Sequence, residues 1–296
     1  ERPEDLPALA DRLGDIRDAN TAHHVELIAA AADADARIIG LGELFPAPYF
    51  ALERREMWRN LAEDPHDGPT VRAMQRAAAR RSIVIIAPIY ELEKTTGRRF
   101  NTAVVIDADG SILGKYRKVH IPRGSNEQGT FDERFYYQPA EIPQNAPSPK
   151  ILGKNPYFPV FDTAAARVGV AICYDRHFEG VMSSLARAGA QIVFSPAVTF
   201  GQKSRRMWPL EFAVDAARHN IFIAGSNRSG SEKPWNQPYF GQSHFTGPNG
   251  PLENIATHPD LVIADIDLDQ LESPDPAGWN LQRDTRPETY DNGPRP

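Results

Sequence analysis

The chain has 296 residues, of which 41% are hydrophobic and 24% are charged, and its formal net charge is -6. This acidic balance argues against a nucleic-acid-binding surface, which needs Lys and Arg clustered on one face. The single Cys excludes a disulfide within the chain, and no apolar run approaches the roughly 20 residues that span a bilayer.

The first half of the chain alternates helix and strand patterns. Residues 21–34 have an apolar face typical of a helix, which Asn20 would cap. A short buried strand is expected next, and after it a helix, a central strand and two antiparallel strands. These elements are expected at residues 37–41, 70–81, 83–89, 101–106 and 112–116.

Glu43 lies directly after the first expected strand, close to Phe45, Pro46 and Tyr49. Apolar surroundings disfavour the ionised carboxylate, which raises its pKa towards the range of a base that works near neutral pH. A helix cap or a surface acid is the alternative for Glu43. The aromatic neighbours favour a general base over these two alternatives.

A basic cluster closes the strand that ends near Tyr116. We expect Lys115 and Arg117 on a solvated face, because they alternate with Tyr116 along the strand. Lys118 differs because a Pro-bounded segment follows it. We expect this segment, residues 123–141, to be a long loop with a function.

Cys173 ends an apolar run, residues 168–172, with the length and β-branching of a buried strand. Open α/β sheets often place chemistry at the carboxyl end of such a strand. A lone Cys can also behave as a small buried hydrophobe. Its position alone therefore leaves a nucleophile and a packing residue both open.

The second half repeats the order of the first. Its helices and strands are expected at residues 178–188, 191–195, 204–219, 221–226, 241–245, 252–256 and 261–266. Two halves of the same order predict an α/β protein, a four-layer α-β-β-α sandwich of two mixed sheets with helices on the outer faces. We expect one domain over 1–296, with the anchor-rich tail 274–296 docking on another surface or subunit.

Three segments together resemble the nitrilase (carbon-nitrogen hydrolase) superfamily. They are Glu43 after a strand, Lys118 in Tyr-Arg-Lys-Val-His-Ile-Pro, and Cys173 in Val-Ala-Ile-Cys-Tyr-Asp-Arg. The resemblance implies an α-β-β-α fold, homodimers or higher homo-oligomers, and no cofactor. The chain departs from the superfamily at its start, since residues 1–20 lack the usual apolar strand that ends in Gln.

The resemblance also implies roles for the site residues. Cys173 would be the nucleophile and Glu43 the general base. Lys118 and the backbone N–H of Tyr174 would stabilise the oxyanion. An amide carbon is a poor electrophile, so the reaction needs both an activated thiol and a stabilised oxyanion.

A fourth acid of the superfamily lies in the loop after the lysine. Glu133 matches it better than Glu127, because the aromatic run 135–137 follows Glu133 at the expected offset. Glu133 could orient Lys118 or relay a proton to the departing amine.

Arg176 lies three residues after the thiol, on a turn that we expect to be exposed. A guanidinium there can clamp a substrate carboxylate in a bidentate manner, and superfamily members that act on N-carbamoyl amino acids are similar in having an Arg at this place. The alternative is an internal ion pair with Asp175 or Glu179. His177 and His120 are further candidates for substrate contact.

The segments around these residues look closest to the β-ureidopropionase group, which predicts cleavage of N-carbamoyl-β-alanine to β-alanine, ammonia and carbon dioxide. An N-carbamoyl-D-amino acid hydrolase, an aliphatic amidase and a catalytically silent binding protein of the same fold are alternatives. A serine hydrolase is disfavoured because the chain has no Gly-Xaa-Ser-Xaa-Gly. The His residues lack the paired spacing of a metal site. We expect a small anionic substrate, no metal, no nucleic-acid or membrane partner, and a cytoplasmic location.

Overall fold

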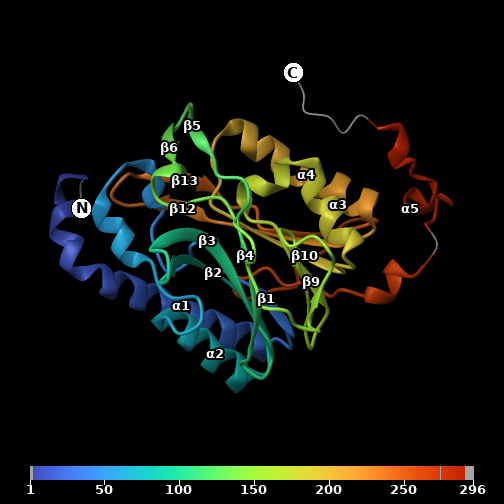
Figure 1. Cartoon of the computed structure of the whole chain (residues 1–296), viewed down its shortest axis with the longest axis horizontal. Coiled ribbons are helices and arrows are strands. Elements are labelled where there is room, and N and C mark those ends of the chain that lie inside the picture. Colours follow the sequence, from blue (N-terminus) through green and yellow to red (C-terminus); the bar gives the residue numbers. More distant parts are fainter. Residues whose placement is uncertain (1–2, 274, 291–296) are drawn as a thin grey trace.

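A computed structural model describes residues 3–273 and 275–290 of the chain. Two sheets face each other, and helices cover the outer side of each sheet (Figure 1). The predicted α-β-β-α sandwich is therefore confirmed. In the described residues no helix combines the length and the apolar character needed to cross a membrane.

The first sheet has the strand order β1-β2-β3-β4, in which β1 and β2 are parallel and the other pairs antiparallel. Val84 and Ile86 pack towards the second sheet, whereas Ile85 and Ile89 pack with the helices, as the two-residue period of a strand requires. The elements of this half are α1 (Leu13–Asp33), β1 (Ile38–Gly40), α2 (Pro69–Arg81), β2 (Val84–Glu93), β3 (Arg98–Ile106) and β4 (Ile112–Arg117).

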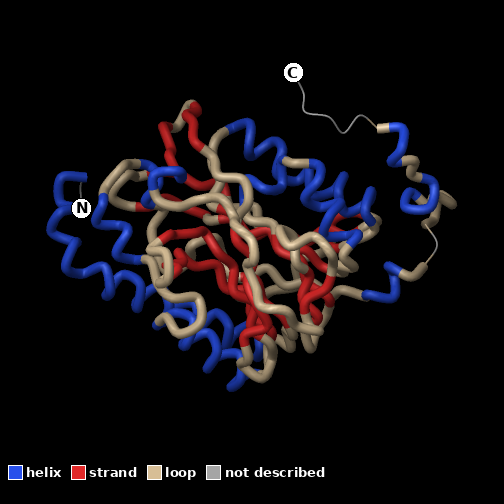
Figure 2. The backbone as a smooth tube through the Cα atoms, in the orientation of Figure 1, coloured by secondary structure: helices blue, strands red, loops and turns tan. Residues whose placement is uncertain are grey.

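The second sheet has the order β15-β14-β11-β10-β9-β8-β7. Its centre, β9, β10 and β11, is parallel, so the carboxyl ends of these strands meet at one edge. Figure 2 shows both groups of strands enclosed between helices. The elements are β7 (Ile151–Leu152), β8 (Val160–Asp162), β9 (Arg167–Val170), α3 (Glu179–Arg187), β10 (Ile192–Ala197), α4 (Gln202–His219), β11 (Phe222–Asn227), β14 (His244–Gly247) and β15 (Gly250–Pro251).

Two hairpins extend from this body. The segment expected to be a long loop, 123–141, contains β5 (Arg123–Asn126) and β6 (Gly129–Asp132), so that expectation is wrong in part. The second hairpin comprises β12 (Ser229–Glu232) and β13 (Gln237–Phe240). Short helices complete the chain: η1 (Pro3–Arg12), η2 (Phe50–Leu52), η3 (Glu56–Leu61), η4 (Glu133–Phe135), η5 (Cys173–His177), η6 (Leu268–Leu271), α5 (Leu281–Asp284) and η7 (Pro287–Thr289).

The amino-terminal helix starts earlier than predicted. Since α1 begins at Leu13, Asn20 lies inside it and is not its cap. The Asn20 side chain donates instead to the Pro46 carbonyl at 3.2 Å. Residues 3–37 contain no strand, so β1 is the edge of the first sheet in the described part of the chain.

Two predicted strands, 252–256 and 261–266, are wrong, because neither segment forms a strand in the structure. An extended segment becomes a strand only where a neighbour completes its hydrogen-bond ladder. The Ile263 N–H donates instead to a side chain, the Asn254 amide oxygen, at 3.0 Å. Segment 261–266 and the strand β1 both line a cavity of about 960 Å³.

The described part of the carboxyl-terminal tail, residues 275–290, lies at the side of the molecule away from β5 and β6 (Figure 1). Trp279 and Tyr290 in it are 66% and 56% exposed. Docking of this tail on another surface stays a prediction, and residues 274 and 291–296 lie outside the described part.

Candidate active site

The ends of three strands bring the candidate catalytic side chains together. Glu43 follows β1, Lys118 follows β4 and Cys173 follows β9, and all three are buried. Because β9 and β10 are parallel, the thiol also lies beside Val198, the residue that follows β10.

Lys118 lies between two carboxylates. Its Nζ donates to Glu43 Oε1 at 2.8 Å and to Glu133 Oε2 at 2.7 Å. Burial alone would lower the pKa of Lys118, but the charges of Glu133 and Glu43 outweigh it and raise this pKa above its ordinary value. The ammonium is therefore fixed in place and stays charged at neutral pH.

The Glu43 carboxylate has two further donors. The Asn101 side chain donates to Oε1 and the Val198 N–H donates to Oε2, both at 2.7 Å. With Lys118, three groups from three elements fix its orientation. A carboxylate held in this way needs no reorganisation to accept a proton.

Glu133 completes the cluster, and Tyr49 OH donates to its Oε1 at 2.9 Å. Burial, together with the nearby charge of Glu43, raises the pKa of Glu133 although Lys118 opposes the shift. The rival acid Glu127 lies elsewhere, since it is exposed and accepts the Gln202 N–H.

Cys173 has φ of 51°, an uncommon backbone conformation for a residue with a side chain, of the kind often found at functional sites. Its sulfur faces the Val198 carbonyl at 3.9 Å. Burial, followed by the charge of Glu43, raises the pKa of the thiol to about 12. The thiol is therefore protonated at neutral pH and needs a base before it can attack.

A buried carboxylate, Asp175, supports the turn that carries the thiol. It accepts hydrogen bonds from Tyr116 OH at 2.6 Å and from the backbone N–H groups of His120 and Ile172 at 2.9 Å and 3.2 Å. His120 Nδ1 lies 2.7 Å from the same carboxylate, and its ring stacks on Phe178. This anchors His120 next to the Cys173 turn.

Tyr174 and His177 make the turn exposed as expected, but Arg176 on it is only 2% exposed, so the expectation of an exposed guanidinium is wrong. Trp208 and Glu211, which lie on one face of α4, cover it: the guanidinium stacks 5.0 Å from the Trp208 ring, and Nε pairs with Glu211 at 3.2 Å. This acid is neither of the two internal partners that the sequence suggested. Arg176 Nη1 donates to the Cys173 carbonyl at 2.7 Å and lies 4.0 Å from the sulfur.

The remaining two candidates flank this arginine. His177 Nδ1 lies 2.5 Å from Glu211 Oε1, so the acid bridges His177 and Arg176. The Tyr174 side chain is 37% exposed and meets the His177 ring edge to face. A role for its backbone N–H at the oxyanion stays a prediction.

Four residues of the site were not among the candidates proposed from the sequence: Tyr49, Asn101, Asp175 and Glu211. Asp175 stands in a segment that carries the family resemblance, so its position was a usable signal. Asn101 could be found only from the sheet register, because its carbonyl accepts the Lys118 N–H at 2.8 Å. The cavity beside β1 is lined by none of Glu43, Lys118 and Cys173.

Comparisons with known proteins agree with this geometry. The family model of carbon-nitrogen hydrolases matches residues 16–274. A β-ureidopropionase of Arabidopsis thaliana is 32% identical over 281 residues, which are 89% of this chain but only 64% of the relative. An N-carbamoylputrescine amidase of Solanum tuberosum is 32% identical over 285 residues, covering 92% of this chain and 88% of the amidase. A carbon-nitrogen hydrolase structure from Helicobacter pylori G27 matches with a TM-score of 0.77 at 23% identity, covering 93% and 92% of the two chains.

Proposed function

Because this chain belongs to the carbon-nitrogen hydrolase family of the nitrilase superfamily, we propose that it hydrolyses an N-carbamoyl amino acid without a cofactor. The proposed substrate is N-carbamoyl-β-alanine, with one water consumed and β-alanine, ammonia and carbon dioxide released. The observation that carries the proposal is the Lys118 ammonium held between Glu43 and Glu133 beside a buried thiol.

The first step forms an acyl intermediate on Cys173. Glu43 takes the thiol proton as the sulfur bonds to the carbamoyl carbon, and the carbonyl electron pair moves onto oxygen. Lys118 and the Tyr174 N–H stabilise the oxyanion. The electron pair then returns from the oxyanion to form the carbonyl again. The C–N bond breaks, and the nitrogen leaves with a proton from Glu43.

Water completes the cycle and releases a carbamic acid, whose remaining C–N bond then breaks to give carbon dioxide and the second amine. Glu43 takes a proton from the water that attacks the acyl carbon, and the sulfur recovers a proton when the C–S bond breaks. Glu133 keeps Lys118 in place through both steps, since its Oε2 accepts from Nζ at 2.7 Å. Its second oxygen is held by Tyr49, so it acts as a fixed support.

Arg176 supports an anionic substrate. Its Nη1 lies 4.0 Å from the sulfur, so the positive charge lies beside the reacting carbon. A guanidinium presents several donors in one plane, which matches a carboxylate. His177 contacts the same Glu211, and its imidazole provides a second donor beside the guanidinium.

The ion pair between Arg176 and Glu211 supports a second candidate, a simple amidase for neutral amides. A guanidinium whose charge is balanced by an internal carboxylate attracts a substrate carboxylate less strongly. The two candidates differ in what Arg176 does: in the first it binds substrate, and in the second it only supports the Cys173 turn.

Ammonia release from N-carbamoyl-β-alanine, N-carbamoyl-D-alanine and propionamide separates these candidates. We expect the first compound to give the highest kcat/KM, and Arg176→Gln to raise KM for it well beyond any change in KM for propionamide. A preference for propionamide that Arg176→Gln leaves intact would support the amidase.

Mass spectrometry of the protein mixed with N-carbamoyl-β-alanine tests the nucleophile directly. A transient carbamoyl adduct should map to Cys173 and be absent from Cys173→Ala. Turnover by Cys173→Ala at the wild-type rate would refute the proposed mechanism.

We also propose that the enzyme is a homo-oligomer. Leu210 and Val214, one turn apart on α4, are 52% and 50% exposed, and an apolar pair of this kind is typical of a contact surface. The carboxyl-terminal tail is a second candidate surface. Light scattering should give the mass of at least a dimer for wild type, and a smaller particle mass for Leu210→Glu. A monomeric wild type would contradict the proposal.

A further inference from the structure

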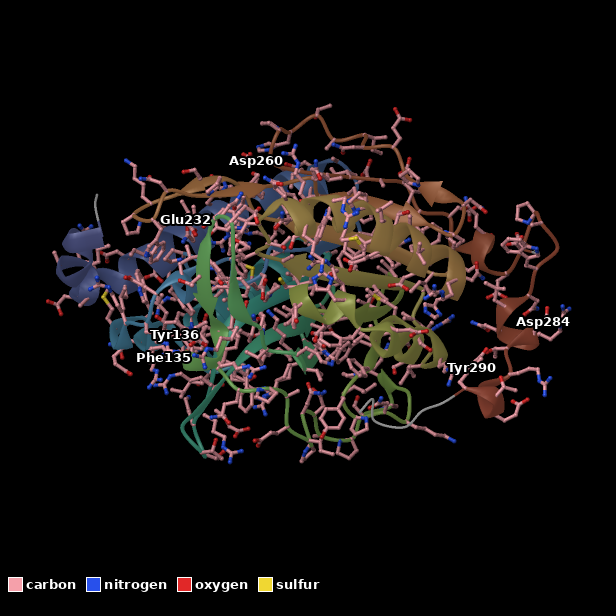
Figure 3. All side chains as sticks on the ribbon, turned by 90° about the horizontal axis from the view of Figure 1, so that it is seen from above. Phe135, Tyr136, Glu232, Asp260, Asp284 and Tyr290 are labelled. Atoms are coloured by element: carbon pink, nitrogen blue, oxygen red, sulfur yellow. The ribbon has the colours of Figure 1, made fainter. Side chains whose placement is uncertain are left out.

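We propose that Arg228 and Glu232 are positioning residues that fix residues 43–49, the base loop. Neither residue belongs to the cluster of Lys118, Glu43 and Glu133. The inference rests on the proposed role of Glu43 as the general base. Arg228 lies between β11 and β12, and Glu232 ends β12. They act on the loop from the second half of the chain, and Glu232 lies on the same side of the molecule as Tyr136 (Figure 3).

The base loop has a conformation that needs support. Leu44, next to the base, has φ of 50°, a left-handed conformation that a residue with a side chain rarely adopts. Two tight turns follow, in which the Phe45 N–H donates to Gly42 and the Ala47 N–H donates to Leu44. Local strain of this kind persists only where the surroundings fix it.

Arg228 contacts three backbone carbonyls of the base loop. Its Nη2 lies 3.2 Å from the Glu43 oxygen, 3.1 Å from the Ala47 oxygen and 3.5 Å from the Leu44 oxygen. The guanidinium therefore contacts the backbone of the base itself and of the turn that follows it.

Glu232 holds both the arginine and the far end of the loop. Its Oε1 accepts from Arg228 Nη1 at 2.5 Å, and its Oε2 accepts the Tyr49 N–H at 2.9 Å and the Tyr239 hydroxyl at 3.2 Å. Because Tyr49 OH in turn donates to Glu133, the β12–β13 hairpin is linked to both carboxylates that flank Lys118.

The hairpin acts by geometry more than by charge. Glu232 balances the charge of Arg228, so little net field reaches Glu43. What Arg228 adds is a rigid donor plane that reaches several oxygens at once. A lysine keeps the charge but loses that plane, so it should restore the function only in part.

The matched control is Arg123 in the other hairpin, β5–β6. It pairs with Asp132 of the same hairpin at 3.6 Å, as Arg228 pairs with Glu232, but it is largely exposed. Arg123→Gln should leave kcat, KM and thiol alkylation at wild-type values.

Arg228→Gln and Arg228→Lys are compared with wild type in ammonia release, in the rate of Cys173 alkylation by iodoacetamide, and in the urea midpoint. We expect kcat to fall about 10- to 100-fold in Arg228→Gln with KM nearly unchanged, because small misplacement of a reacting group costs rates of this order. Alkylation should slow as well, since the thiol depends on Glu43 for deprotonation. Arg228→Lys should lie between Arg228→Gln and wild type.

Wild-type kcat and alkylation in a folded Arg228→Gln would overturn the inference, as would a loss of kcat that only follows the folded fraction. If Arg228→Gln does not fold, Arg228→Lys and Glu232→Gln are measured in the same assays. Wild-type kcat and alkylation in both of these variants would then overturn the inference. A wild type that releases no ammonia would refute the proposed function, whereas the alkylation rates would still test the positioning by Arg228.

Discussion

Two buried ion clusters lie on either side of strand β4, and we propose a catalytic role for only one of them. The catalytic cluster consists of Lys118, Glu43 and Glu133. The sheet cluster consists of Lys115, Arg117, Glu91 and Glu93. Both combine basic side chains with carboxylates in the interior, yet only the catalytic cluster adjoins the thiol.

The pleat of the strand separates the two clusters. Lys115 and Arg117 project from one face of β4, and successive residues point to opposite faces. Both cations bind Glu91 Oε1 at 2.5 Å, and Arg117 also binds Glu93 at 2.7 Å. Tyr116, on the other face, donates to Asp175 in the turn that carries Cys173.

The balance of charge explains the different roles. Two cations and two carboxylates balance in the sheet cluster, and Arg117 and Lys115 lower the pKa of Glu91 although burial opposes them. In the catalytic cluster one cation faces two carboxylates, and burial and the charge of Glu43 raise the pKa of Glu133. Burial and pairing alone therefore do not make a site, whereas an excess of carboxylate beside a thiol provides a proton acceptor.

Removal of the cation from each cluster should give the largest contrast. Lys118→Ala should lower kcat about 100- to 1,000-fold, because loss of one oxyanion donor costs about 3 to 4 kcal/mol. Ammonia release by the folded fraction measures this effect. Lys115→Ala, the control in the sheet cluster, should keep the kcat of the folded enzyme; an equal loss in both would erase the distinction between the clusters.

Glu91→Gln should damage stability and spare catalysis. It leaves Lys115 and Arg117 with only Glu93 to balance two buried charges, and breaking a buried pair costs about 3 to 5 kcal/mol. Urea unfolding should show this loss, while kcat/KM of the folded enzyme stays close to wild type. A variant as stable as wild type would mean that the sheet cluster adds nothing to the fold.

The alternation of Lys115, Tyr116 and Arg117 correctly predicted that they face two sides, but it wrongly predicted a solvated face for the cations. The partner Glu91 lies on β2, and the two strands are separated by β3. A strand pattern shows which residues share a face, and the partner that covers this face comes only from the sheet order. Lys118 was singled out because of the segment that follows it.

The same limit applies to Arg176 and to segment 261–266. Sequence adjacency placed Arg176 on an exposed turn, but Trp208 and Glu211 of α4 cover it. The apolar pattern of 261–266 is that of a strand, yet a single backbone bond from the Ile255 N–H to the Ile263 carbonyl, at 2.9 Å, does not make a ladder, and the segment belongs to none of the sheets in the described structure. The positions of most helices and strands followed from local periodicity and the fold class from its repeat in the two halves, whereas burial, pairing and the order of strands in a sheet depend on contacts that are distant in sequence.

The two clusters should also respond to pH in opposite directions. The folded pKa of Glu91 is lowered, so its stabilisation is present above the ordinary carboxyl pKa of 4.5 and is lost as the pH falls through the folded value. The folded pKa of Glu133 is raised, so its contribution is complete below 4.5 and is lost as the pH rises through the folded value.

Urea midpoints from about pH 4 to 8 test this contrast, at about 1.4 kcal/mol for each unit of pKa difference. The advantage of wild type over Glu91→Gln should shrink towards acid pH. The advantage of wild type over Glu133→Gln should be greatest at acid pH and shrink as the pH rises. Parallel curves for the two variants would contradict the opposite signs.

The smallest contrast concerns the hydroxyl that each cluster uses. Tyr49 OH donates to Glu133 at 2.9 Å, and Thr102 OH donates to Glu91 at 2.5 Å. Each bond is expected to contribute about 1 kcal/mol, so Tyr49→Phe should lower kcat about fivefold through the altered support of Lys118. Thr102→Val should lower the free energy of unfolding by about 1 kcal/mol and leave kcat unchanged. Since both variants lose a single donor to a buried carboxylate, a fall in kcat in Thr102→Val as large as that in Tyr49→Phe would show that the two clusters are coupled through the sheet.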